Sequence, residues 1–180
     1  MLAAGLCLSG CNRAGKEARV EQSAQMEQTI SALRGAYAAF NRGDIEAALE
    51  PLDAQIEWSE PAEFPGGGTF HGHDGVRRYL TQSREAWAEG RSEPEDFIPA
   101  GDRIVVFVHA RVRAKGGSEW HDVRLADVYT IRNGKAIQMR AFADRTEALR
   151  WVGLGRKVQL AEIRLTDFSI KRISDYLVVR

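Results

Sequence analysis

The spacing of apolar residues changes once along the chain, from a helical period to a strand period. Apolar residues spaced three and four apart over residues 26–40 predict a helix, which Gly43 ends. Asp44 is a typical N-cap for a second, short helix, and residues 54–59 have the pattern of a strand. Asp74 is placed to cap a third helix over residues 74–87. The first half of the chain is therefore predicted to be mainly helical.

Strand patterns dominate after residue 93. Asn133-Gly134 between two of these patterns is a strong signal for a tight hairpin turn. A short helix is expected from Asp144 to Val152, and the Pro- and Gly-rich residues 60–73 are expected to form a loop. The predicted strands cover residues 93–100, 103–114, 119–131 and 136–143. This order indicates an α+β fold, in which a curved antiparallel sheet is wrapped around three helices.

Composition and charge narrow the classes of function. The 180 residues are 44% apolar and 28% charged, which is typical of one globular domain with tails. Lys plus Arg and Asp plus Glu both total 25, so the net charge is zero and no nucleic-acid partner is expected. The two cysteines, Cys7 and Cys11, lie near the N-terminus, which excludes a disulfide framework in the rest of the chain.

The first eleven residues, MLAAGLCLSGC, are apolar and small, and charge begins at Arg13. This segment resembles the end of a bacterial lipoprotein signal peptide, and Leu8-Ser9-Gly10-Cys11 matches its lipobox. It departs from that pattern in lacking a basic region before a short apolar run. The resemblance implies a signal segment over residues 1–11, lipidation of Cys11, and a polar tether over residues 12–24. The chain would then lie in the cell envelope, lipid-anchored or secreted, and would contact the membrane only through the lipid. The alternative is an apolar terminus without processing.

Four short stretches, in order, carry a resemblance to a known family: AFNRGDIEAALEPL, IEWSEP, FHGHDGVRRYL and DVYTIRNGKAIQMRAFADRTEAL. The chain resembles the SnoaL-like group of the nuclear transport factor 2-like superfamily. The resemblance implies a cone with an interior pocket over residues 25–155, and leaves residues 156–180 as an extension of unknown structure. Members include ketosteroid isomerases, polyketide cyclases, dehydratases, and binding or dimerisation modules, so we expect a homodimer.

The resemblance places catalytic positions as well. The general base of the ketosteroid isomerases, at the end of the first strand, falls near Trp58, so the base is absent or displaced here. Their protonated oxyanion-binding Asp matches Asp127, and their oxyanion-binding Tyr lies close to Tyr37. The carboxylate that polyketide cyclases keep on the last strand falls at Ala141. Neither reaction can therefore be transferred to this chain.

The residues themselves keep two interpretations of Asp127 open. Strand alternation puts Asp127 on the same face as Leu125 and Tyr129, a mostly apolar face that we expect to point inward. Asp127 is then either half of a structural ion pair or hydrogen bond, or an acid in a pocket, with His109, Arg111 or Arg140 as partners.

Further candidates for a ligand pocket are Trp58, His71, Tyr129 and Arg140. The His71-Gly72-His73 pair lacks a third ligand, so we expect no metal site and no cofactor. The preferred function is an exported domain that binds a small hydrophobic molecule in a conical pocket. The alternatives are an isomerase-, cyclase- or dehydratase-type enzyme that uses Asp127 with His109 or Tyr37, and a dimerisation or protein-interaction module.

Overall fold

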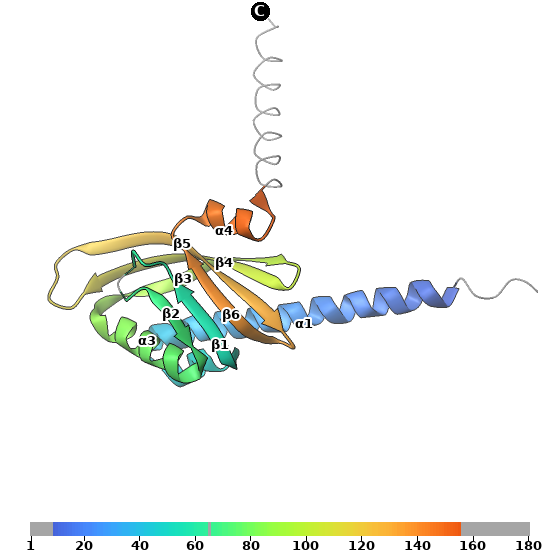
Figure 1. Ribbon diagram of the computed structural model, residues 1–180, viewed down its shortest axis with the longest axis horizontal. Coiled ribbons are helices and arrows are strands. Elements are labelled where there is room, and N and C mark those ends of the chain that lie inside the picture. Colours follow the sequence, from blue (N-terminus) through green and yellow to red (C-terminus); the bar gives the residue numbers. More distant parts are fainter. Residues whose placement is uncertain (1–8, 65, 156–180) are drawn as a thin grey trace, which may run out of the picture.

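A curved six-stranded sheet and the helices on its concave side form the body of the domain (Figure 1). The computed structural model describes residues 9–64 and 66–155, with side chains from residue 15 onward. The helices are α1 (Ser9–Arg42), α2 (Ile45–Leu49), α3 (Gly72–Ala86) and α4 (Arg145–Trp151). The predicted α+β class and the curved sheet around helices are confirmed. The predicted extension over residues 156–180 and the first eight residues of the signal segment lie outside the described residues.

The strand order in the sheet is β2-β1-β6-β5-β4-β3. The strands are β1 (Leu52–Glu60), β2 (Gly68–His71), β3 (Trp87–Ala100), β4 (Arg103–Ala114), β5 (Trp120–Arg132) and β6 (Lys135–Phe142). The expectation of a wholly antiparallel sheet is wrong at one point, because β1 pairs with β6 in parallel. This pairing brings the start of the domain beside its end.

Local sequence signals explain most of the element boundaries. Gly43, with φ of 81°, ends α1, and the Asp44 carboxylate accepts a hydrogen bond from Ala47 N at 3.2 Å as the cap of α2. Asn133 and Gly134 both have positive φ, as the tight β5–β6 turn requires.

Two boundaries differ from the sequence prediction. The predicted loop over residues 60–73 contains β2, which pairs antiparallel with β1. The third helix begins before Asp74, which lies in its first turn and pairs with Arg77 at 2.6 Å instead of capping the helix. The helix also ends before Trp87, which opens β3.

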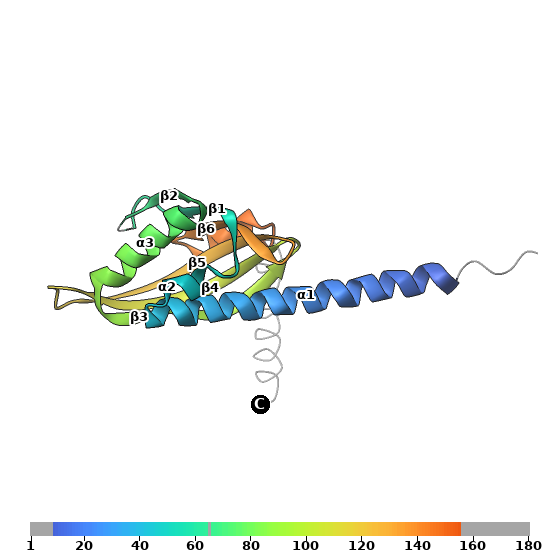
Figure 2. The same cartoon turned by 90° about the horizontal axis from the view of Figure 1, so that it is seen from below.

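The first helix is much longer than its apolar pattern predicted. It includes residues 12–24, which were expected to form a polar tether, and the residues from 15 to 25 are exposed. Figures 1 and 2 both show this part of α1 extending past the sheet. A role as a tether stays a prediction, but the described segment is helical.

The two faces of the sheet carry separate clusters of buried side chains. The concave face packs on α1, α2 and α3 through a large cluster that includes Leu33, Ile56 and Met139. The convex face packs on α4 through a smaller cluster that includes Val128 and Phe142. Strand alternation therefore decides which side chains can reach the interior of the cone.

Gly90 in β3 lies where the backbones of β3 and β4 approach each other closely. Gly90 has φ of +132°, and a Cβ there would overlap the Arg111 carbonyl oxygen and lie 2.5 Å from Val112 Cα. We expect Gly90→Ala to lower the free energy of unfolding by about 2–3 kcal/mol in denaturant titrations, because both backbones would have to shift. Gly35→Ala is the control, because Gly35 lies in α1 and a Cβ built there has no neighbouring atom within 4 Å. This variant should raise the free energy of unfolding by about 0.5–1 kcal/mol. Equal effects would contradict the packing described.

Candidate functional site

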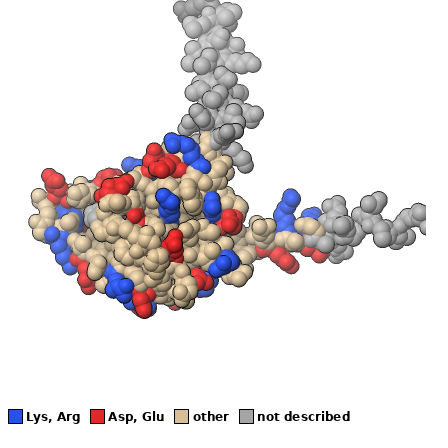
Figure 3. Space-filling view, in the orientation of Figure 1, with Lys and Arg blue, Asp and Glu red and all other residues tan. Residues whose placement is uncertain are grey.

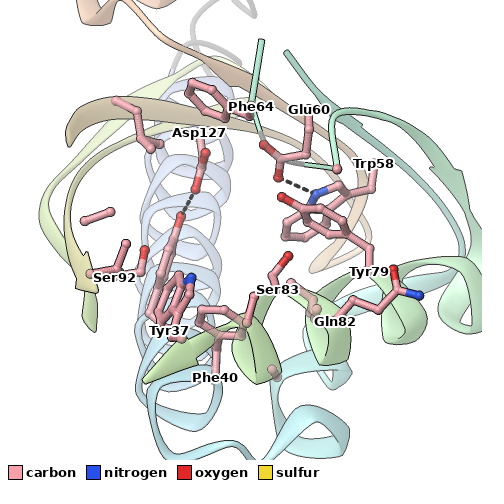
Figure 4. Close-up of a pocket in the computed structure, with 18 of the residues that line it drawn as sticks. Tyr37, Phe40, Trp58, Glu60, Phe64, Tyr79, Gln82, Ser83, Ser92 and Asp127 are labelled. Carbon is pink, nitrogen blue, oxygen red and sulfur yellow. Dashed lines mark hydrogen bonds between the residues drawn. The ribbon is translucent and has the colours of Figure 1, made fainter. Parts of the chain in front are cut away.

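A cavity of about 610 Å³ lies between the concave face of the sheet and helices α1 and α3 (Figure 4). Its volume is within the range of small-molecule sites. One cluster of polar groups in the lining comes from α1, β1, α3 and β5, and is formed by Tyr37, Trp58, Glu60, Tyr79, Asp127 and Tyr129. Gln82, Ser83, Ser92 and His121 add further polar side chains to the lining.

A chain of buried hydrogen bonds joins α1 to β5. The Tyr37 hydroxyl donates to Asp127 Oδ2 at 2.5 Å, and the Tyr129 hydroxyl donates to the Tyr37 oxygen at 3.1 Å. Tyr37 lies on the apolar face of α1 that packs against the sheet. Asp127 and Tyr129 are two residues apart on β5, so both point from the concave face of the sheet. The structure therefore shows Asp127 hydrogen-bonded to Tyr37 and in the lining of the cavity, and its role as a pocket acid stays a prediction.

Burial dominates the electrostatics of this network. Asp127 is 8% exposed. Desolvation raises the pKa of its carboxyl group to about 6, and the hydrogen bond from Tyr37 opposes this rise. Burial and the nearby Asp127 charge also raise the pKa of Tyr37 and of Tyr129, so both phenols stay protonated and act as donors.

A second carboxyl group, which the sequence prediction missed, faces the same space. Glu60 is the last residue of β1, and its Oε1 accepts a hydrogen bond from Trp58 Nε1 at 2.8 Å (Figure 4). Burial, followed by the charge of Asp127, raises the pKa of Glu60 to about 8, while hydrogen bonds from Trp58 and Tyr79 lower it. Burial and the charge of the other carboxylate therefore favour one protonated group in this pair of carboxyl groups near neutral pH.

A carboxyl group lies one strand period beyond Trp58, the position near which the general base was predicted to be absent or displaced. Trp58 and Glu60 are two residues apart on one strand and so share a face, and both line the cavity. The sequence pattern predicts that this strand ends at Ser59, because Pro61 and the glycines after it indicate a loop. A carboxylate one strand period beyond Trp58 was the available signal.

Two predicted site residues lie on the wrong side of the sheet. Val106 pairs with Asp127, so His109 points to the opposite face, where its Nε2 lies 2.8 Å from Asp122 Oδ1. The predicted pairing of Asp127 with His109 is wrong. The predicted pocket role of Arg140 is also wrong, because its guanidinium lies 5.3 Å from the Phe142 ring centroid in the cluster under α4.

The histidines of the His-Gly-His stretch do not come together. His71 lies exposed on β2 opposite Glu57 and does not line the cavity, so its predicted ligand contact is not seen. His73 Nε2 lies 3.2 Å from the Leu52 carbonyl oxygen. Within residues 9–64 and 66–155, no group of three or more His, Cys, Asp or Glu side chains is placed to hold a metal ion.

The charge of the cavity limits what it can hold. Among the described residues, the lining includes two carboxyl groups and no Lys or Arg. A cofactor with phosphate groups would therefore meet like charges without a compensating cation. Two carboxyl groups that share a proton are suited to donate a hydrogen bond to one neutral oxygen and to accept a proton from a neighbouring atom.

The raised pKa of Glu60 predicts a pH dependence of stability. The folded state binds the Glu60 proton more tightly than the unfolded state, so the stability from this group is present at low pH. It is lost as pH rises from about 4.5 to about 8. We expect the unfolding free energy of the wild type, minus that of Glu60→Gln, to fall by roughly 2 kcal/mol or more between pH 5 and pH 8.

Chemical denaturation at each pH measures this difference. Glu57→Gln is the matched control, because Glu57 lies on the same strand and bonds to Gln138 at 2.9 Å instead of facing the cavity. The difference in unfolding free energy between the wild type and Glu57→Gln should depend much less on pH. Parallel curves for wild type and Glu60→Gln would contradict the raised pKa.

Comparison with known proteins places the chain in a family. Residues 33–139, more than half of the chain, match the model of the SnoaL-like domain. An NTF2-like protein of unknown function from Burkholderia pseudomallei is 31% identical, with 69% of this chain and 97% of that chain covered and a TM-score of 0.59. TerC, co-crystallised with polyporic acid, is 29% identical. The match covers 70% of this chain and 98% of TerC, with a TM-score of 0.58.

A protein with a ketosteroid isomerase-like fold from Catenulispora acidiphila, in complex with trimethylamine, is similar in fold. It is 16% identical, with coverages of 70% and 92% and a TM-score of 0.56. A comparison with curated proteins found no match. The family match, together with the cone-shaped sheet and its cavity, shows that this chain belongs to the SnoaL-like family of NTF2-like proteins.

Proposed function

We propose that this chain binds a small, largely apolar molecule in the cavity and holds one neutral oxygen atom of that molecule at the Glu60–Asp127 end. The observation that carries the proposal is an apolar cavity of about 610 Å³ with two carboxyl groups of raised pKa at one end. Protonated Glu60 supplies a donor to a carbonyl or hydroxyl oxygen. The apolar walls remove the rest of the ligand from water.

The aromatic residues around this end favour a ligand with flat or hydrophobic parts. Trp58 packs against Tyr79 and Tyr129 with ring centroids 6.4 Å and 6.3 Å apart, and Phe70 stacks on Tyr79 at 4.5 Å. The crystallisation of the related TerC with polyporic acid supports an organic ligand in a domain of this kind.

A second candidate function is proton transfer on such a ligand. One observation favours it: two carboxyl groups line the same cavity, and burial raises the pKa of both, so that one can stay protonated while the other is ionised. Glu60 would donate its proton to a carbonyl oxygen, and the Asp127 carboxylate would take a proton from the adjacent carbon, which gives the enol. The reverse transfers at another carbon would complete an isomerisation.

The binding proposal predicts a loss of affinity when Glu60 is removed. Benzophenone, a compact neutral ketone, should bind saturably and change the fluorescence of Trp58 and Trp87, which both line the cavity. Glu60→Ala should weaken this binding about tenfold, the equivalent of one hydrogen bond. Above pH 8 the wild type should weaken similarly, because the donor proton is lost.

Glu57→Ala, on the same strand but facing away from the cavity, should bind benzophenone as the wild type does. Absence of saturable binding would overturn the proposal. Equal affinities for Glu60→Ala and the wild type would overturn the role of Glu60. Benzophenone has no hydrogen on the carbons next to its carbonyl, so proton transfer needs an alkyl ketone such as 2-hexanone. Hydrogen–deuterium exchange at its α-carbon that depends on Asp127 would support the proton-transfer candidate.

Export and lipidation remain part of the proposal and rest on the Leu8-Ser9-Gly10-Cys11 pattern. Cys11 lies near the start of α1, before the residues with described side chains. No helix in the described part of the chain is long and apolar enough to cross a membrane. Membrane association, if present, would depend on the lipid.

Lipidation predicts a clear change in fractionation. Cys11→Ser in the full-length gene should move the protein from the membrane to the soluble fraction, because the acceptor of the lipid is lost. Cys7→Ser is the matched control and should leave the protein in the membrane fraction. Unchanged membrane association of Cys11→Ser would contradict the lipoprotein proposal.

Two expectations about partners also remain proposals. The face in Figure 3 carries basic and acidic side chains side by side and no single basic patch, which supports the absence of a nucleic-acid partner. A homodimer rests on the family resemblance alone, and sedimentation equilibrium would test it.

A further inference from the structure

The cavity extends well beyond the carboxyl groups, along the hairpin of β4 and β5. Alternate residues of β5 from Tyr129 to His121 line it, as do alternate residues of β4 from Ala110 to Ala114. Tyr129 and His121 are eight residues apart on one strand, which corresponds to about 26 Å. The cavity is therefore long in the direction of the hairpin, with the carboxyl groups near one end.

The lining changes in character along this length. Beyond Leu125 the walls are mainly apolar, and we call this part the apolar trough. Its apolar walls are formed by Phe40, Ala86, Trp87, Ala110, Val112, Ala114 and Val123. Ser92, which pairs with Ala110, and His121, which pairs with Val112, add two polar side chains to it. Small side chains on two facing strand positions, such as Ala110 opposite Val123, leave room that a larger side chain would fill.

Part of the apolar trough is open to water in this structure. The Val123 side chain lies on the inner face of β5, yet the residue is 38% exposed. Exposed apolar surface continuous with a buried cavity is stabilised by an apolar occupant. A compact ligand at the carboxyl end would leave this surface uncovered, whereas a chain would cover it.

The polar end of the cavity, at Glu60 and Asp127, determines which functional group a bound chain molecule can carry at its end. Glu60 and Asp127 face it, and no Lys or Arg lines the cavity among the described residues. A carboxylate or phosphate head would meet negative charge, while a carbonyl or hydroxyl oxygen would meet donors and acceptors.

We propose that the ligand is a flexible hydrocarbon-chain molecule with a neutral oxygen group near one end. The oxygen lies between Glu60 and Asp127, and the chain follows the apolar trough past Ala110 and Ala114. This inference rests on the proposed function, because it concerns the same cavity. It names the class of ligand: long-chain ketones or alcohols and not fused-ring compounds or fatty carboxylates.

A series of 2-alkanones from six to sixteen carbons tests the proposal, with binding followed by tryptophan fluorescence. Affinity should rise about threefold to fourfold for each added methylene, until the trough is filled. Fatty acids of equal length should bind at least tenfold more weakly at pH 8, because their carboxylates are ionised.

A variant that fills the trough should act only on long chains. Ala110→Trp should weaken binding of the longest 2-alkanones tenfold or more and leave 2-hexanone and benzophenone unchanged. Ala114→Trp, at an exposed position near the hairpin end, provides a second blocked trough if Ala110→Trp does not fold. Arg124→Trp is the matched control, because Arg124 lies on the same hairpin and faces outward.

The outcomes separate this inference from the proposed function. If benzophenone binds but affinity does not depend on chain length, the chain-ligand inference fails and the proposed function stands. If affinity depends on chain length but both trough variants bind long chains normally, the assigned path is wrong. If neither benzophenone nor any alkanone binds, the proposed function itself fails.

Discussion

The burial of Asp127 is the constraint on which the site depends. A carboxyl group inside an apolar cone is costly unless it is hydrogen-bonded or neutralised. The protein satisfies Asp127 with the Tyr37 hydroxyl, 2.5 Å away and 90 positions distant in the sequence. The bond joins the inner face of β5 to α1, so it adds a directional contact to the apolar packing between the first helix and the sheet. Removal of the tyrosine hydroxyl would leave a buried acceptor without its donor.

A second carboxyl group changes what this arrangement can do. Glu60 alone would be a buried acid near a pocket wall, and Asp127 alone would be a hydrogen-bonded structural residue. Together they resist ionising at the same time, so burial and mutual repulsion keep a proton in the site near neutral pH. Most of the remaining lining is apolar, so this proton is a main polar feature of that end of the cavity.

The sequence was sufficient for the fold class, the closing hairpin and the inward direction of Asp127 and Tyr37, because these follow from helical spacing, strand alternation and turn chemistry. His109 was misplaced because a one-residue difference in the β4–β5 register exchanges the two faces, and the loop between the strands does not fix that register from sequence alone. Arg140 was misplaced because a bulge between Thr130 and Ile131 shifts the β5–β6 register by one residue, so that Ala141 and not Arg140 lies opposite Asp127. Glu60 was missed because β1 continues to Glu60, directly before Pro61, where local composition indicates a loop. The pairing of Glu60 with Gly68 of β2 extends the strand to this residue.

The most direct test of this account is a titration of the side-chain carboxyl groups by ¹³C NMR, in wild type and in Glu60→Gln. The account predicts two carboxyl groups with pKa values of about 6 or above in the wild type. In Glu60→Gln one of these titrations should disappear, and the other, from Asp127, should remain above the ordinary range of an aspartate because burial persists. Completion of every carboxyl titration below about pH 5 would contradict the claim that the cone holds a proton between Glu60 and Asp127.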